Sequence, residues 1–133
     1  MILNFRVITP YCVFLEDQAD EILLSTNTGQ IGILSKHAPL ITSLDVGVFF
    51  FRMKSNNWNS IAIMGGFAIV KNDNIIILAN EAESFDTIDL QEAKLDFENA
   101  KQKFIEATNI KQRVSANFEL KRAKARYEVK ISK

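Results

Sequence analysis

The residues that most often interrupt regular secondary structure are confined to the first two thirds of this sequence. Both prolines and all five glycines lie before residue 86, and residues 86–133 contain neither type. Proline and glycine are costly inside helices and are favoured in turns. The chain is therefore predicted to contain two domains with different secondary structure, residues 1–85 and residues 86–133.

Residues 1–85 have the pattern of an all-β domain. Short runs rich in β-branched and aromatic residues alternate with turn signals such as Asn27-Thr28-Gly29 and Lys71-Asn72-Asp73-Asn74. The runs cover residues 3–7, 21–26, 30–34, 40–44, 47–53, 58–64, 67–71 and 74–79. Short strands at this spacing predict an antiparallel β-sandwich or a barrel.

Residues 86–133 have the pattern of two helices. One apolar stripe is spaced alternately by three and four residues, and a second one follows it; they are Leu90, Ala93, Phe97, Ala100, Phe104 and Ala107, and then Ala116, Leu120, Ala123, Tyr127 and Ile131. This spacing is that of one face of an α-helix. Asp89 followed by Glu92 indicates a helix start near Asp89, and Thr108-Asn109 separates the stripes. We predict an antiparallel two-helix hairpin after the sandwich.

The helical stripes are rich in alanine, which has consequences for stability. Alanine allows helices to approach closely, but its side chain removes little apolar surface from water. The hairpin is therefore predicted to be marginally stable alone and able to detach from the surface on which it packs.

The net charge of zero conceals an asymmetry between the two parts. Residues 1–85 carry a net charge of −3, from five Lys/Arg and eight Asp/Glu, and residues 86–133 carry +3, from eleven and eight. Residues 109–133 carry +6, because eight basic residues face only Glu119 and Glu128. This pattern is that of a solvated helix face or of a tail that meets a negatively charged partner. Nucleic acid is not expected, because the whole chain is neutral and no aromatic platform accompanies the basic run.

The sequence lacks the residues that catalysis or metal binding would need. It has one cysteine, Cys12, and one histidine, His37, so neither a disulfide within the chain nor a self-contained zinc site is expected. We predict that Cys12 is a small buried apolar residue and that His37 lies in a surface turn. Gly65-Gly66 is predicted to form a tight turn or a bulge rather than to hold a ligand. No catalytic residue, metal or cofactor is expected.

Neither a targeting segment nor a membrane span is expected. The longest near-continuous apolar run, Ile61–Val70, has ten residues, whereas a spanning helix needs about 20. No charged leader precedes the first apolar residues, so no signal or transit peptide is predicted. From the residues alone, the chain is predicted to be a non-catalytic protein-contact module with a basic, detachable helical hairpin.

Several strings of this sequence, in this order, resemble the epsilon subunit of F-type ATP synthases. They are EILLSTNTGQIGIL at residues 21–34, HAPL at 37–40, MGGFA at 64–68, IILANEAE at 76–83 and ID at 88–89. The resemblance covers essentially the whole chain and is greatest to the plastid and cyanobacterial branch. It implies a β-sandwich of about ten strands followed by a helical hairpin.

The resemblance also implies partners and contact residues. The sandwich of this family binds the gamma subunit and rests on the polar loops of the membrane ring of c subunits. The ring contact maps onto Thr26, Asn27, Thr28, Gly29 and Gln30 and onto the neighbouring turn of Lys36, His37, Ala38 and Pro39. The apolar sandwich surface that the hairpin leaves uncovered is expected to face gamma.

The hairpin is the regulatory part of this family. In many members it extends along gamma to the catalytic alpha/beta hexamer and inhibits ATP hydrolysis. An acidic segment of the catalytic subunits is expected to meet Lys121, Arg122, Lys124 and Arg126 here. Some bacterial members bind ATP through Ile/Leu-Asp-x-x-Arg-Ala, which corresponds to Phe118–Ala123 in this chain. Arg122 and Ala123 match that pattern, whereas Glu119 stands in place of aspartate and Phe118 in place of the aliphatic residue.

Two functional interpretations follow. The first is a non-catalytic rotor subunit that couples proton flow to ATP synthesis. It is peripheral on the stromal side of the chloroplast thylakoid membrane, or on the cytoplasmic face of a bacterial or cyanobacterial membrane. The second is a free-standing nucleotide-sensing or adaptor module with the same architecture.

Overall fold

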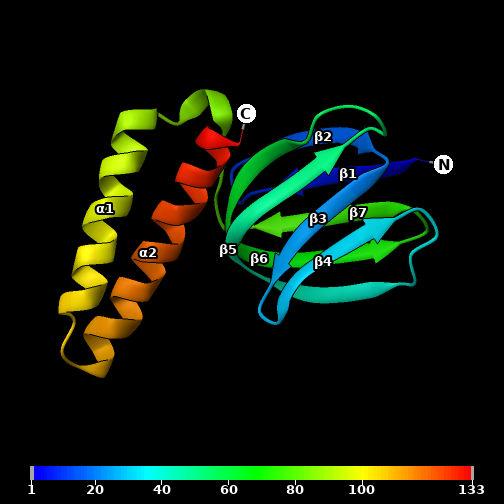
Figure 1. Ribbon diagram of the computed structural model, residues 1–133. Helices are drawn as coiled ribbons and strands as arrows, with labels where there is room; N and C mark the ends of the chain where they lie inside the picture. The colour runs from blue at the N-terminus through cyan, green and yellow to red at the C-terminus, as the bar shows by residue number, and fades with distance from the viewer. Residues whose placement is uncertain (1, 133) are drawn as a thin grey trace.

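A computed structural model describes residues 2–132 and confirms a β-sandwich followed by a two-helix hairpin (Figure 1). The strands are β1 (Leu3–Ile8), β2 (Val13–Ala19), β3 (Glu21–Thr26), β4 (Gly29–Leu34), β5 (Leu40–Arg52), β6 (Asn59–Lys71), β7 (Asn74–Ala79) and β8 (Ala82–Ser84). A single 3₁₀ turn, Phe85–Thr87, leads to α1 (Leu90–Glu106) and α2 (Ile110–Ile131).

The described residues form eight strands rather than about ten. Four predicted runs merge into two strands, because β5 and β6 have 13 residues each and continue through Asp45 and Gly65 without a turn. β2 escaped prediction because Glu16, Asp17 and Gln18 are consecutive polar residues, which hide the alternation of a half-buried strand. The very short strand β8 gave no signal either.

The strands follow the order β2-β1-β7-β6-β5-β3-β4, with β8 paired to β6. The pairings given for the described residues are antiparallel except that of β1 with β7, which is parallel. The sheet folds over one apolar core, because side chains of β1 touch side chains of β5 although the two strands are not neighbours in the sheet. The ring centroids of Phe5 and Phe51 are 4.8 Å apart, and those of Phe5 and Phe49 are 5.3 Å apart.

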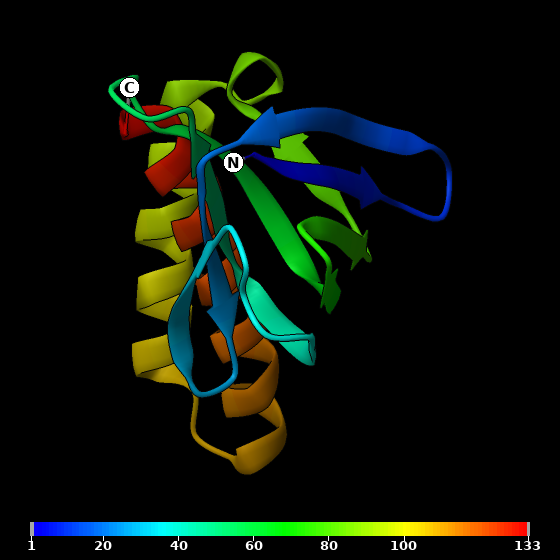
Figure 2. The same ribbon diagram turned by 90° about the vertical axis from the view of Figure 1, so that its right-hand side faces the viewer.

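A second apolar cluster joins the hairpin to the outside of β5 and β6. Alternate residues of a strand face opposite sides, so Phe49 faces the sandwich core while Val48 faces the hairpin. Val48, Ala62 and Met64 pack with Ala125 and Val129 of α2. α2 lies against this face and α1 packs on the far side of α2 (Figure 1), so that the helices are away from the β1–β2 hairpin (Figure 2).

Gly65-Gly66 forms a bend inside β6 and not a turn. The register of β5 with β6 is the same on both sides of the bend, with Leu44 opposite Gly66 and Val46 opposite Met64. The bend shifts which side chains face inward, as a bulge does: Ile61 and Ile63 belong to the core before it, and Ala68 and Val70 after it. Both glycines have positive φ, 82° and 146°, a region that other residues rarely adopt.

The predicted helix boundaries are confirmed. The Asp89 side chain accepts a hydrogen bond from the backbone N–H of Glu92 and caps α1. Asn109 caps α2 in the same way, through Gln112. Both caps satisfy N–H groups that a helix start leaves without partners. The change from strands to helices lies between Ser84 and Leu90, and the division into two domains at residue 85 stays a prediction.

Gly66→Ala is expected to destabilise the chain by about 3 kcal/mol or more. A Cβ atom there would lie 2.0 Å from the carbonyl oxygen of Leu78, in addition to the strain of positive φ. The measurement is the free energy of unfolding in denaturant. Gly29→Ala provides the matched control, because Gly29 also has positive φ but has open space around its Cα; it should cost only about 1–2 kcal/mol. Equal losses for the two variants would contradict the assigned clash.

Candidate functional site

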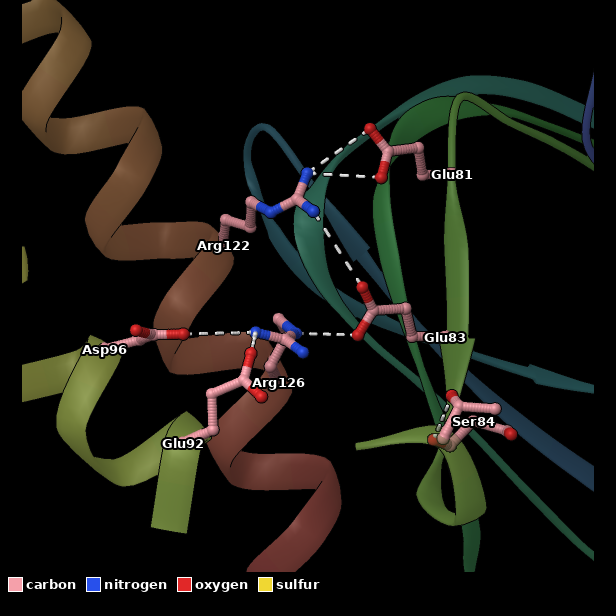
Figure 3. Close-up of polar contacts among 8 residues, drawn as sticks. Glu81, Glu83, Ser84, Glu92, Asp96, Arg122 and Arg126 are labelled. Carbon is pink, nitrogen blue, oxygen red and sulfur yellow. Dashed lines mark hydrogen bonds and ion pairs between the residues drawn. The ribbon is translucent and has the colours of Figure 1, made fainter. Parts of the chain in front are cut away.

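The basic side chains of α2 face carboxylates of the sandwich and of α1 (Figure 3). Arg126 lies at the centre of this arrangement. Its Nε donates to Glu83 Oε2 of β8 at 2.6 Å, and its Nη1 lies 3.3 Å from Asp96 Oδ2 and 3.9 Å from Glu92 Oε1 of α1. The Arg126 side chain is 16% exposed. One guanidinium group therefore joins α2 to both neighbouring elements.

The pKa of Arg126 lies above the ordinary arginine value. Partial burial would lower this pKa, but the hydrogen bond to Glu83 and the attraction of Glu83, Glu92 and Asp96 outweigh that effect. A raised pKa in a basic group stabilises the folded form at every pH below the ordinary value and loses that effect only as the pH rises through the folded-state pKa. Arg126 therefore stays charged throughout the neutral range, and its own titration gives these contacts no pH sensitivity there.

Arg122 lies one helical turn before Arg126 and shares one of its partners. Its Nη1 lies 3.2 Å from Glu81 Oε2, and its Nη2 lies 3.8 Å from Glu83 Oε1. Glu83 thus bridges both arginines (Figure 3). We refer to Arg122 and Arg126 with Glu81, Glu83, Glu92 and Asp96 as the ion-pair cluster.

Lys121 and Lys124 differ from the two arginines and from each other. Lys121 Nζ donates to Asp45 Oδ2 of β5 at 2.9 Å, which adds a contact between α2 and the sandwich. Lys124 pairs with Glu128 of its own helix at 3.8 Å and is well exposed. Of the four residues predicted to meet an acidic partner, three therefore contact sandwich carboxylates here, and Lys124 does not.

A groove of about 480 Å³ between α1 and α2 contains the residues of the possible nucleotide pattern. Glu119, Arg122 and Ala123 line it together with Lys103 and Arg126. Glu119 pairs with Lys103 at 3.6 Å. Phe118, the first residue of that pattern, is half exposed and does not line the groove. The arginines of this groove already hold carboxylates, so a bound anion would have to compete with them.

The segment predicted to meet a membrane ring forms a compact turn between β3 and β4. Thr26 Oγ1 donates to the carbonyl oxygen of Gly29 at 2.6 Å and accepts from the backbone N–H of Thr28. Asn27 donates to Ser43 of β5 at 2.9 Å. The side chain of Gln30 is exposed. The turn is thus stiffened by its own hydrogen bonds while its outer surface stays accessible.

The second predicted ring segment, Lys36–Pro39, lies at the opposite end of β4. A six-residue strand separates it from Gly29, which corresponds to roughly 17 Å. It packs instead beside the β6–β7 turn, where the Lys36 backbone N–H donates to Asp73 at 2.7 Å. The structure brings Thr26–Gln30 together as one surface and places Lys36–Pro39 on a separate one.

An apolar patch lies on the outer face of the sheet away from the hairpin. Cross-strand partners share one face, and the pairs Ile41–Ile69, Ile69–Ile76 and Phe67–Leu78 form the patch. Ile41 is 74% exposed, Phe67 55% and Leu78 43%. We call these five residues the outer apolar patch. Contiguous exposed apolar surface of this kind marks protein contact sites.

The prediction for Cys12 is wrong, because Cys12 is exposed. It lies in the turn between β1 and β2, where its carbonyl oxygen accepts from the backbone N–H of Thr9. The strand pattern suggested burial, but the strand ends at Ile8. His37 lies in a turn as predicted and hydrogen-bonds the carbonyl oxygen of Ala38 through Nδ1.

Residues 2–132 hold no group of three or more potential metal ligands. No helix among the same residues is long and apolar enough to cross a membrane.

Sequence reasoning missed the internal partners of the basic residues. It gave Glu81 and Glu83 no role and placed the partners of Arg122 and Arg126 outside the chain. A signal was present: IILANEAE places two carboxylates on the same face of the segment that leads into the hairpin. The contact needed the second apolar face of α2, formed by Ala125 and Val129, which the predicted stripe did not include.

The sandwich, the helix attached to it and the exposed apolar patch together indicate a module that binds other proteins.

The family model "ATP synthase, Delta/Epsilon chain, beta-sandwich domain" matches residues 2–85. The chloroplastic ATP synthase epsilon chain of Oltmannsiellopsis viridis is 56% identical over 129 residues, covering 97% of this chain and 98% of that protein. That of Chlorella vulgaris is 54% identical, covering 97% and 96%. The chain belongs to the ATP synthase epsilon-chain family, in its chloroplast branch.

Solved structures share the fold at low sequence identity. A chain in the Euglena gracilis mitochondrial ATP synthase (OSCP/F1/c-ring) gives a TM-score of 0.79 at 21% identity, covering 92% of this chain and 78% of that one. A chain in the Tetrahymena thermophila mitochondrial ATP synthase (central stalk/c-ring) gives 0.65 at 17% identity, covering 96% of both. Family membership makes this chain a non-catalytic subunit of an ATP synthase rather than a free-standing module.

Proposed function

We propose that this chain is a central-stalk subunit that links the gamma subunit to the membrane ring of c subunits and inhibits ATP hydrolysis through its hairpin. The observation that carries the proposal is the way α2 is attached. Its apolar contact with the sandwich is made by the small residues Ala125 and Val129, with Tyr127 packed against the same cluster, and ion pairs to Asp45, Glu81 and Glu83 add to it. Exposed ion pairs contribute only about 0–1 kcal/mol each. Such an interface holds the hairpin closed and still allows it to open.

The inhibitory contact is assigned to the basic face of α2. When the hairpin extends, Lys121, Arg122, Lys124 and Arg126 meet carboxylates of the alpha/beta hexamer. Opening frees Lys121, Arg122 and Arg126 from the sandwich, and Lys124 is already exposed. The net charge of +6 in residues 109–133, which include Lys133 outside the described residues, supports an acidic partner.

The gamma subunit is assigned to the outer apolar patch. The patch lies on the sandwich face that the hairpin leaves free, so it stays accessible whether the hairpin is closed or open. Its exposed members Ile41, Phe67 and Leu78 come from three adjacent strands and present one continuous rigid surface. Aromatic and aliphatic anchors of this kind carry most of the binding energy at protein interfaces.

The membrane ring is assigned to the turn Thr26–Gln30, whose exposed polar surface suits polar loops. Lys36–Pro39, at the other end of β4, makes a second and separate contact within the same assembly. The subunit then lies at the stromal surface of the thylakoid membrane without entering it.

A second candidate function is weak nucleotide binding in the groove between the helices. The favouring observation is that Lys103, Arg122 and Arg126 line one groove of about 480 Å³. Guanidinium groups bind phosphate oxygens well. The opposing observation is that Glu83, Glu92 and Asp96 already occupy Arg126.

Locking the hairpin in its closed position should abolish inhibition of ATP hydrolysis. The Oγ atoms of Ser60 and Ser132 lie 3.1 Å apart, so Ser60→Cys with Ser132→Cys can form a disulfide between β6 and the end of α2. In a Cys12→Ser background, the oxidised chain should leave the hydrolysis rate of an epsilon-depleted complex unchanged. The same chain should inhibit after reduction.

Each single cysteine variant serves as the control and should inhibit under both redox conditions. Full inhibition by the oxidised double variant, with the disulfide verified by mass, would show that the hairpin does not need to open.

Phe67→Lys should weaken binding to the gamma subunit by about tenfold or more. A charge in the middle of the outer apolar patch would have to be desolvated on binding. Phe67 is already more than half exposed, so the fold should be unaffected. Surface plasmon resonance with immobilised gamma measures the change.

Two variants control this experiment. Leu95→Lys places the same charge at a comparably exposed apolar residue of α1 and should leave gamma binding unchanged. Gln30→Glu should likewise spare gamma binding while changing retention of the chain on the isolated ring. The gamma assignment is wrong if Leu95→Lys weakens binding as much as Phe67→Lys does.

Calorimetric titration with ATP tests the second candidate function. The expected dissociation constant is on the order of 1 mM or weaker, because the phosphates must displace carboxylates from both arginines. Arg122→Gln should remove the heat of binding, and Lys124→Gln, outside the groove, should preserve it. A flat trace for the unaltered chain would exclude the site.

A further inference from the structure

The arginines assigned to an acidic partner already hold acidic groups in the closed hairpin. Arg122 and Arg126 contact four carboxylates, two from the sandwich side and two from α1 (Figure 3). A guanidinium group has a limited number of donors in a fixed planar arrangement. The same groups cannot hold these carboxylates and those of another protein in the same geometry.

The four carboxylates are not equivalent, because they belong to parts of the chain that move differently. Glu92 and Asp96 lie on α1 and travel with the hairpin. Glu81 and Glu83 lie at the end of the sandwich and stay behind when the hairpin leaves. Contacts to α1 hold the two helices together, whereas contacts to Glu81 and Glu83 hold α2 to the sandwich.

Glu83 is the stronger of the two sandwich carboxylates. It is the only residue in the described part of the sandwich that forms an ion pair with Arg126, at 2.6 Å, and it also reaches Arg122. The pair is mostly buried, with Arg126 at 16% and Glu83 at 23% side-chain exposure. Water and salt screen such a pair less than the pair of Arg122 with Glu81, whose members are 36% and 54% exposed.

We infer that Glu83 controls the inhibitory activity of the hairpin by binding Arg122 and Arg126 in competition with the carboxylates of the partner. This inference rests on the proposed function and adds its regulation. Closing the hairpin masks the two guanidinium groups, and partner contact requires that Glu83 release them. The strength of inhibition then depends on a difference between two binding free energies, that of the arginines for Glu83 and that of the arginines for the carboxylates of the partner.

The inference predicts different effects on inhibition for the two members of the pair. Glu83→Gln keeps the shape of the side chain and removes its charge, so it should open the hairpin and leave both arginines available. Arg126→Gln should also open the hairpin, but it removes one of the groups that the partner needs. Inhibition should therefore increase in Glu83→Gln and not in Arg126→Gln.

Asp96→Asn is the matched control. Asp96 contacts the same Arg126 group at 3.3 Å, but it lies on α1 and does not tie the hairpin to the sandwich. This variant should leave the hairpin closed and inhibition unchanged. Unchanged circular dichroism verifies the fold of all three variants.

Hairpin position is measurable in the full chain by double electron–electron resonance. The single cysteine, Cys12, is exposed in the β1–β2 turn and accepts one spin label. A cysteine introduced as Lys111→Cys in the first turn of α2 accepts the second. Glu83→Gln should raise the ratio of open to closed molecules about tenfold, which corresponds to about 1.4 kcal/mol. The same variants, without labels, are then added to an epsilon-depleted complex for the ATP hydrolysis assay.

Three outcomes would overturn the inference. An unchanged distance distribution in Glu83→Gln would show that Glu83 does not hold the hairpin. Opening in Glu83→Gln with no increase in inhibition would show that the arginines are not masked. Equal opening in Asp96→Asn would remove the special role of the sandwich carboxylate. Failure of the proposed function is recognised separately, by full inhibition from the oxidised Ser60→Cys/Ser132→Cys chain.

Discussion

The close approach of α2 to the outer face of β5 and β6 determines how the two parts of this protein interact. Ala125 and Val129 are small enough to let the helix axis come near the strands, where Val48, Ala62 and Met64 receive them. A leucine or phenylalanine in their place would bury more apolar surface, but it would move the helix outward. The arginines would then lie farther from Glu83. Small side chains at this contact thus make the ion pairs possible, and they also keep the apolar contribution low.

The sandwich separates the surfaces proposed for its partners by using different faces and ends of the same strands. β5 and β6 present one face to the core, and their outer face divides between the hairpin at one half and the outer apolar patch at the other. The bend at Gly65-Gly66 makes this division possible, because it shifts the side-chain alternation between the two halves of β6. The turn at Thr26–Gln30 then lies at one end of β4 and Lys36–Pro39 at the other. A rigid sandwich can therefore hold several partners at once without placing them on one surface.

The fold was predictable from the sequence where local pattern and tertiary structure agree. The glycine and proline distribution, the apolar stripes, the capping signal of Asp89 with Glu92 and the break at Thr108-Asn109 predicted both helices, the start of α1 and the break between the helices. The failures have physical causes. β2 contains three consecutive polar residues, so its alternation is weak and its pairing with β1 decides its structure. Cys12 lies just beyond a strand whose end the pattern did not mark. The contact residues of α2 were predicted as a set, but their internal partners were not, because ion pairs between residues about 40 positions apart leave no periodic signal.

The opposite charges of the two parts take on a definite meaning in the folded chain. The sequence pattern alone suggested that the basic tail meets an external negative partner, yet Asp45, Glu81 and Glu83 of the negatively charged sandwich already neutralise Lys121, Arg122 and Arg126. A chain with a net charge of zero can therefore contain a strongly basic helix face that its own carboxylates neutralise. Opening would expose this basic surface of α2 together with the acidic surface of the sandwich. Loss of the ion pairs costs free energy unless each surface binds a new partner. An acidic partner for the helix relieves half of that cost, which is the physical reason why closed and partner-bound forms of one hairpin can be close in free energy.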